Sequence, residues 1–115
     1  MVKPDVRWRA VSAADPRTIM FNPRQLQRKF KHAVDFGVMG KYSRQQATMF
    51  ERAIRVHVEN ETTQMIPGTY RGEPVTHFVN LQTGLNVMRD MQGVFVSGWR
   101  LTSVQLANVL VRRSL

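Results

Sequence analysis

Residues 65–99, MIPGTYRGEPVTHFVNLQTGLNVMRDMQGVFVSGW, decide the fold class. In this stretch, short runs with a strand-like period of two are separated by turn-forming residues. The runs are 65–66, 69–70, 74–80, 85–89 and 94–99, and the intervals are Pro67-Gly68, Arg71-Gly72, 82–84 and 90–93. This pattern predicts a meander of about four antiparallel strands.

Two helices are predicted before these strands, because apolar residues recur there at helical spacing. The first, over about 23–35, follows Asn22 as a cap and has Pro23 at its first position. The second, over about 44–59, follows Ser43 in a Ser-x-x-Gln capping box. The expected core positions are Leu26, Phe30, Ala33 and Val34 in the first helix, and Ala47, Phe50, Ile54 and Val58 in the second.

A short closing helix is predicted after the strands. Residues 102–105, Thr-Ser-Val-Gln, form another capping box, and the helix is expected to end at about Arg112. The apolar residues on one side of it are Val104, Leu106, Val109 and Leu110. The predicted fold is therefore α+β, with N-terminal helices packed on an antiparallel sheet of about four strands and a short C-terminal helix.

Residues 1–21 show no sustained hydrophobic period, and we expect a linker or leader arm that is ordered only near its end. Residues 22–115 then form a single domain, which the length of 115 residues fits. No apolar run approaches the roughly 20 residues of a transmembrane helix, so no membrane span is expected.

Charge and the absence of cysteine restrict the possible functions. The formal net charge is +9, and 12 of the 17 basic residues lie within residues 1–60. Such a surface attracts a polyanion, meaning nucleic acid, an anionic membrane or an acidic protein. The chain has no Cys, which excludes disulfides, thiolate zinc sites, iron–sulfur clusters and cysteine nucleophiles.

The densest candidate site lies in the first helix. Lys29 and His32 are three residues apart and share one flank, while Lys31 lies on the other side of the apolar stripe. An imidazole between cations is suited to proton transfer beside a phosphodiester, because the cations bind the phosphate and favour the neutral ring. Metal-free RNA cleavage needs a base for the 2′-hydroxyl, cations for the developing negative charge and a proton donor for the leaving 5′-oxygen. The spacing alone, however, favours a solvated basic helix face with an incidental histidine.

Residues 94–99 hold a second candidate site. Strand alternation predicts that Phe95, Ser97 and Trp99 lie on one face, with Val94 and Val96 on the other. On this reading Ser97 donates to a phosphate oxygen and Trp99 stacks on a base. Composition alone favours the structural alternative, in which Trp99 packs under the last helix and Ser97 satisfies a strand end.

The other two histidines carry less weight. His57 lies at the edge of the apolar stripe of the second helix and is predicted to be a packed histidine. His77 has Val75 and Val79 as same-face neighbours and fits either the core or the active face. No two histidines have metal-ligand spacing and no acidic cluster accompanies them, so neither a metal site nor a cofactor is expected.

Taken together, the two candidate sites resemble the colicin D nuclease domain family, over about residues 24–115. The matching residues are Lys29-Phe30-Lys31-His32-Ala33, Asp35-Phe36-Gly37, Gly68-Thr69-Tyr70-Arg71-Gly72, Pro74-Val75, His77-Phe78, Asn80, Thr83-Gly84-Leu85-Asn86-Val87 and Phe95-Val96-Ser97-Gly98-Trp99. The order and separation of Lys-Phe-Lys-His and Ser-Gly-Trp make this match more specific than either motif alone.

The resemblance implies a ribonuclease toxin with the barnase/EndoU/colicin-type fold. It implies cleavage of tRNA in the anticodon loop without a metal, leaving a 2′,3′-cyclic phosphate and a 5′-hydroxyl. It also implies that His32 is catalytic, that Lys29 and Lys31 assist, and that Ser97 and Trp99 belong to the active site. For the proton that the leaving oxygen needs, Lys31, His77 and His32 itself remain alternatives.

The resemblance further implies a cognate, acidic immunity protein that fills the cleft of a monomeric toxin. It implies secretion or cell-surface delivery as the C-terminal part of a larger bacteriocin or contact-dependent inhibition protein, with action in the cytoplasm of the target bacterium. The rival hypothesis is a non-catalytic RNA-binding or regulatory module that uses the same basic helix and tryptophan. A DNA-binding domain is less favoured, because no helix-turn-helix frame is evident.

Overall fold

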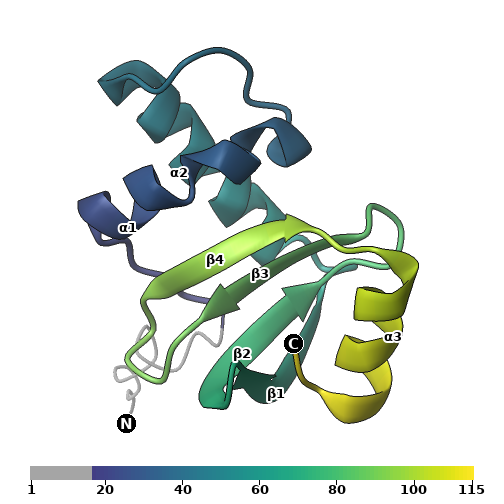
Figure 1. Cartoon of the computed structure of the whole chain (residues 1–115). Coiled ribbons are helices and arrows are strands. Elements are labelled where there is room, and N and C mark those ends of the chain that lie inside the picture. Colours follow the sequence, from purple (N-terminus) through teal and green to yellow (C-terminus); the bar gives the residue numbers. More distant parts are fainter. Residues whose placement is uncertain (1–16) are drawn as a thin grey trace, which may run out of the picture.

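The computed structural model describes residues 17–115 and confirms the predicted α+β fold class (Figure 1). Its elements in chain order are α1 (Pro23–Arg28), the 3₁₀ helix η2 (Phe30–Phe36), α2 (Arg44–Glu59), β1 (Gln64–Tyr70), β2 (Glu73–Val79), β3 (Leu85–Arg89), β4 (Phe95–Arg100) and α3 (Ser103–Arg112). The sheet order is β1-β2-β3-β4, and each strand runs antiparallel to its neighbour. No helix in the described range is long and apolar enough to cross a membrane.

The last five residues of the expected leader arm, 17–21, belong to the part of the chain that the structure describes. Residues 1–16 lie outside the described residues, whereas residues 17–21 contact the folded part. The Arg17 guanidinium donates to the carbonyl oxygens of Val58 and Thr63, at 2.8 Å in each case. Ile19 is buried in the main core. The structured domain therefore includes these last residues of the expected arm.

The first predicted helix is two helices. α1 ends at Arg28, and the chain continues as the 3₁₀ helix η2. A 3₁₀ helix has three residues per turn, so Ala33 stays on the same side as Phe30 while the next residue rotates away. Ala33 is accordingly buried, but Val34 is 54% exposed, and its predicted core position was wrong.

The bounds of α2 agree with the predicted 44–59, but its capping box is only half formed. Ser43 Oγ accepts from the backbone N–H of Gln46, while the Gln46 side chain donates to the carbonyl of Met39. At α3 both halves of the box are present, between Thr102 and Gln105.

The predicted apolar side of α3 is buried only in part. Val109 is buried and Leu106 packs against it, whereas Val104 and Leu110 are exposed. Because α3 covers the sheet with one narrow side, the remaining apolar residues face outward.

β1 is continuous, although Pro67-Gly68 was expected to separate two runs. β1 is at the edge of the four-stranded sheet, where proline costs no ladder hydrogen bond on the open side. Gly68 is required because a Cβ there would lie 1.9 Å from the carbonyl oxygen of Arg113. The C-terminal segment pairs along this edge through a parallel bridge between Thr69 and Ser114.

A β-bulge in β4 changes the predicted alternation. Met88 pairs with Ser97, but Arg89 pairs with Phe95, which leaves Val96 as the extra residue. Phe95 therefore faces the helices, and the prediction that it shares a face with Trp99 was wrong. Its ring lies 6.2 Å from that of Phe50 in α2.

The sheet has a hydrophobic cluster on each face. The larger cluster joins α1, η2 and α2 to one face, and its buried members are Ile19, Leu26, Ala33, Val38, Phe50, Ile54, Val58, Phe78, Val87 and Phe95. The smaller cluster lies under α3, where Trp99 packs against buried Val79, Leu101 and Val109. The two clusters fix η2 and β4 together, which positions the candidate site.

Candidate active site

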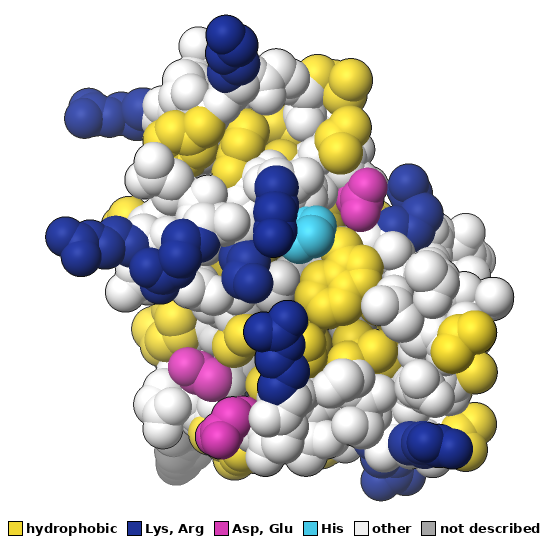
Figure 2. Space-filling view, in the orientation of Figure 1, with side chains coloured by type: hydrophobic (Ala, Val, Ile, Leu, Met, Phe, Trp, Pro, Cys, Tyr) yellow, Lys and Arg dark blue, Asp and Glu magenta, His cyan; other side chains and the backbone are white. Residues whose placement is uncertain are grey.

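A cavity of about 240 Å³ brings together all five site residues predicted from the sequence. Its lining residues are Lys29, Lys31, His32, Tyr70, Arg71, Ser97 and Trp99. Figure 2 shows a histidine on this face with Lys and Arg side chains gathered around it and a hydrophobic surface beside it. The two segments that were separate in sequence thus form one site.

The helical wall of the cavity is attached to strand β4, which is an edge strand. Gln25 Nε2 of α1 donates to the carbonyl of Val96 at 2.6 Å. Asp35 Oδ2 of η2 accepts from the backbone N–H of Arg100 at 2.9 Å. These side chains occupy the open edge of β4 and fix η2 along it. Gly98 permits this approach, because a Cβ there would lie 3.3 Å from Cζ of Phe36.

The tight turn at the start of η2 presents the three basic side chains to one cavity. The N–H of Lys29 donates to Gln25 O at 3.1 Å, and the N–H of His32 donates to Lys29 O at 3.0 Å. Lys31 was expected on the other side of the apolar stripe from Lys29 and His32. Because η2 is a 3₁₀ helix, all three residues instead line the same cavity.

The electrostatic environment favours the neutral form of His32. Burial lowers its pKa, and the charges of Lys31 and Lys29 lower it further, against a smaller opposing effect of Asp35. The pKa of Lys29 is also lowered, first by burial and then by Lys31, Arg71 and Arg28. A neutral imidazole that faces cations is a suitable general base beside an anionic substrate.

Trp99 lies between His32 and Tyr70. Its ring centroid is 5.6 Å from that of His32 and 6.0 Å from that of Tyr70. The indole Nε1–H donates to Gln105 Oε1 at 3.1 Å, so it is already engaged within the protein. The exposed part of the ring provides a surface on which a base can stack.

Ser97 lines the same cavity but is fully buried. Its Oγ has no hydrogen-bond partner among the described residues, and neither does the buried Oδ1 of Asn86. An unsatisfied buried hydroxyl costs about 1–3 kcal/mol. The Ser97 hydroxyl therefore has an unused hydrogen-bonding capacity at the wall of the cavity.

The other two histidines are packed within the fold. His57 is buried, as predicted, and its Nε2 donates to the carbonyl of Phe78 at 2.8 Å. His77, whose place was left open, is fully buried, with Nε2 donating to Thr69 O at 3.0 Å and Nδ1 accepting from Asn86 Nδ2 at 3.1 Å. Because both ring nitrogens are engaged, His77 is not placed to protonate a leaving group in the cavity.

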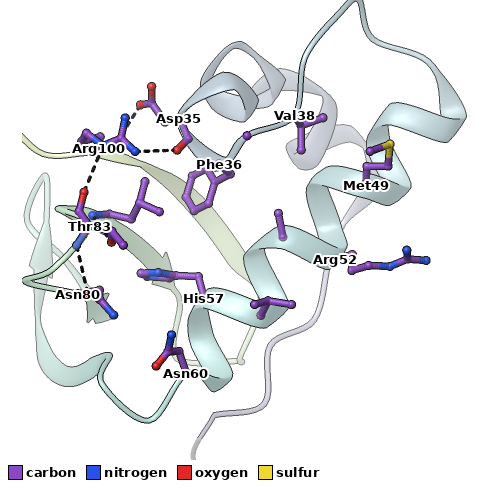
Figure 3. Close-up of a pocket in the computed structure, with 14 residues that line it drawn as sticks. Asp35, Phe36, Val38, Met49, Arg52, His57, Asn60, Asn80, Thr83 and Arg100 are labelled. Carbon is purple, nitrogen blue, oxygen red and sulfur yellow. Dashed lines mark hydrogen bonds between the residues drawn. The ribbon is translucent and has the colours of Figure 1, made fainter.

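A larger cavity, of about 620 Å³, lies between η2 and α2 (Figure 3). None of the five predicted site residues lines it. Its histidine is His57, whose pKa is lowered by burial and whose Nε2 is held by a carbonyl. This cavity therefore lacks the free imidazole and the lysines that make the smaller one suited to proton transfer.

Sequence reasoning missed Tyr70, Arg71 and Gln105. Tyr70 and Arg71 had been assigned to a strand end and a turn, and they were among the residues that carry the family resemblance, but neither had been given a place in the site. Gln105 had been assigned only to a helix cap. Among the described residues, no group of three or more His, Asp or Glu side chains is arranged to hold a metal ion. The chemical groups that line the site are one imidazole, three cations, the hydroxyl of Ser97, the phenol of Tyr70 and the indole of Trp99.

Comparisons with known proteins agree with this geometry. Residues 25–109 match the protein family described as Colicin D. Colicin-D of Escherichia coli is 37% identical over an alignment of 83 residues, which covers 70% of this chain but only 12% of that protein. A solved structure described as a ribonuclease from Escherichia coli complexed with its inhibitor protein superposes with a TM-score of 0.72 and 34% identity, covering 79% of this chain and 100% of that one.

Proposed function

This chain belongs to the colicin D family of ribonuclease toxins, and we propose that it cleaves tRNA in the anticodon loop by metal-independent transesterification. The observation that carries the proposal is the meeting of His32, Lys29, Lys31, Ser97 and Trp99 in one cavity. In the proposed reaction, the 2′-oxygen attacks the adjacent phosphorus and the bond to the 5′-oxygen breaks. The products are a 2′,3′-cyclic phosphate and a 5′-hydroxyl.

His32 is the general base in this proposal. Its neutral imidazole takes the proton of the 2′-hydroxyl, and its lowered pKa supports that role near neutral pH. The leaving 5′-oxygen needs a proton in turn. The burial of His77 leaves two of the alternatives from the sequence, Lys31 and the imidazolium of His32 formed in the first step.

Lys29 and Lys31 stabilise the negative charge that develops on the phosphate oxygens. Both line the cavity beside His32, and no acidic side chain lines it in the described part of the chain. Preorganised cations of this kind are worth several kcal/mol in transition-state stabilisation. Ser97 Oγ, which lacks a partner, donates to a phosphate oxygen, and Trp99 stacks on an unpaired base.

We also propose that a cognate, acidic immunity protein covers this cavity. The structural relative was solved with its inhibitor protein, which supports a protein partner of this kind. The net charge of +9 supports an acidic partner. Since the match covers 12% of Colicin-D, we propose that this domain is delivered as part of a larger toxin and acts in the cytoplasm of the target cell.

The test is incubation of the purified chain with total tRNA, followed by a denaturing gel. We expect discrete fragments from the wild-type chain and intact tRNA with His32→Ala. Mobility-shifted but intact RNA with the wild-type chain would instead support the rival hypothesis of a non-catalytic RNA-binding module. When the chain is purified together with its co-expressed immunity protein, we expect no tRNA fragments.

A further inference from the structure

In the turn between β1 and β2, an arginine occupies a position with a left-handed backbone conformation. The two residues between the strands are Arg71 and Gly72, and their φ angles are +51° and +84°. Two positive φ values in a two-residue hairpin loop are typical of a type I′ turn, in which Asn, Asp or Gly is strongly preferred at the first position. An arginine there costs about 1–2 kcal/mol of backbone strain. Turn formation therefore does not explain Arg71.

The C-terminal segment holds this strained turn in place. The N–H of Arg71 donates to Leu115 O at 2.9 Å, and the N–H of Leu115 donates to Thr69 O at 3.1 Å. Thr69 Oγ1 also donates to Ser114 Oγ at 2.9 Å. These contacts fix the direction in which Arg71 leaves the sheet.

The Arg71 side chain lines the catalytic cavity beside Tyr70. Its guanidinium carbon lies 5.1 Å from the centre of the Tyr70 ring. Tyr70 in turn lies beside Trp99, and Trp99 beside His32. Ring contacts thus run from His32 through Trp99 and Tyr70 to Arg71.

Although Glu73, two residues away, borders a second hollow with it, Arg71 is electrostatically part of the cavity. Its charge contributes to lowering the pKa of Lys29. It forms no salt bridge with any residue of the described range. A planar guanidinium with parallel N–H groups matches the oxygen atoms of a phosphate better than an ammonium does.

We propose that Arg71 binds the RNA phosphate next to the one that is cleaved. With the scissile phosphate at His32 and a base stacked on Trp99, the neighbouring phosphate of the strand falls beside Tyr70, where Arg71 lies. This inference rests on the proposed function, because it assigns a second phosphate of the same substrate. Arg71 is then a substrate-binding residue that contributes to affinity rather than to proton transfer.

The test compares two arginines with the same backbone conformation. Arg113, at the C-terminal cap of α3, is the other non-glycine residue with positive φ among residues 17–115, at +58°, and it does not line the cavity. Arg71→Asn and Arg113→Asn remove the same charge and place a residue that tolerates the left-handed region. Both variants are expected to unfold at the wild-type temperature or above it. Arg71→Gly serves as a second variant of the turn.

RNA affinity is measured in the His32→Ala background with a short fluorescein-labelled single-stranded RNA at several salt concentrations. We expect Arg71→Asn to raise Kd about 10-fold and to reduce the slope of log Kd against log salt by about 0.7. Arg113→Asn is expected to change Kd less than about twofold. In the active chain, Arg71→Asn is expected to raise KM with little change in kcat.

Equal Kd values and equal salt slopes for the two variants would overturn the assignment of Arg71. If the wild-type chain still cleaved tRNA in that case, only this inference would fail. If the wild-type chain left tRNA intact, the proposed function itself would fail.

Discussion

The indole Nε1 of Trp99 donates a 3.1 Å hydrogen bond to Oε1 of Gln105, and the same oxygen accepts from the backbone N–H of Thr102. One side-chain oxygen thus completes the cap of α3 and holds the aromatic ring that lies beside His32. The first turn of α3 is thereby coupled to the geometry of the candidate active site. Gln105 does not line the cavity, so it is a positioning residue.

Replacement of this acceptor is expected to lower tRNA cleavage. Gln105→Leu removes both hydrogen bonds, so we expect about 1 kcal/mol of lost stability from the cap and a roughly 10-fold lower kcat/KM. Gln105→Glu keeps the acceptor and is expected to retain most of the activity. The readouts are cleavage kinetics and Trp99 fluorescence in a Trp8→Phe background, since the chain has 2 Trp.

Gln46→Leu is the matched control for Gln105→Leu. Gln46 lies in the first turn of α2 and donates its side-chain hydrogen bond to Met39, away from the catalytic cavity. We expect it to leave Trp99 fluorescence and cleavage unchanged. Wild-type kinetics and fluorescence for Gln105→Leu would disprove the positioning role.

The pH dependence of cleavage is expected to follow His32. As a general base, His32 must be neutral, so kcat/KM rises with pH through its lowered pKa and then levels off. Lys29→Met removes one of the charges that lower this pKa, so the acidic limb of the profile is expected to move to higher pH. Lys41→Met, which removes a charge outside the cavity, is the control. An acidic limb that stays in place in Lys29→Met would argue against His32 as the titrating base.

Fold stability is expected to fall under mildly acidic conditions because of the two buried histidines. Burial lowers the pKa of His57 and of His77 below the ordinary 6.5. Below pH 6.5 the unfolded chain therefore binds more protons than the folded one, and stability decreases as pH falls toward the folded pKa values. Thermal unfolding between about pH 7.5 and pH 5 measures this slope.

His77→Gln tests whether a buried histidine causes this dependence of stability on pH. It is expected to be less stable at neutral pH, because it disturbs the hydrogen bonds with Thr69 and Asn86, but to lose less stability on acidification. A slope as steep as that of the wild-type chain would assign the acid sensitivity to other groups.

Removal of divalent cations is expected to leave cleavage intact. In the proposed reaction His32 moves the proton and Lys29 and Lys31 stabilise the phosphate, so no step requires a metal. Cleavage assays after dialysis against EDTA test this, with circular dichroism as the control for folding. Loss of activity that Mg²⁺ restores would contradict the mechanism.

The regular part of the fold was predictable because its hydrophobic periods are strong and local. The bounds of α2 and β3 agree with those expected from the sequence. Other features depend on tertiary contacts. Spacings of three fit both an α-helix and a 3₁₀ helix, so the break after Arg28 was not visible in the pattern. The bulge at Val96 likewise depends on pairing with β3, which sets the register.

The site was predictable only where its residues are close in sequence. Lys29, Lys31 and His32 formed a recognisable local cluster, but spacing alone did not place Trp99 beside His32; the family resemblance supplied that expectation. Arg71 enters the site because the C-terminal segment fixes its turn. The two paired segments, around Arg71 and Leu115, are far apart in sequence, so no short sequence pattern indicates that they pair.

The most direct test of the central claim is sequencing of both fragment ends after the purified chain has acted on total tRNA. The proposal predicts cuts within the anticodon loop, with 2′,3′-cyclic phosphate and 5′-hydroxyl ends, and no cuts by His32→Ala. The variant is expected to keep the wild-type unfolding temperature within a few degrees, because His32 is partly exposed. Fragments with 5′-phosphate ends, or undiminished cleavage by folded His32→Ala, would contradict it.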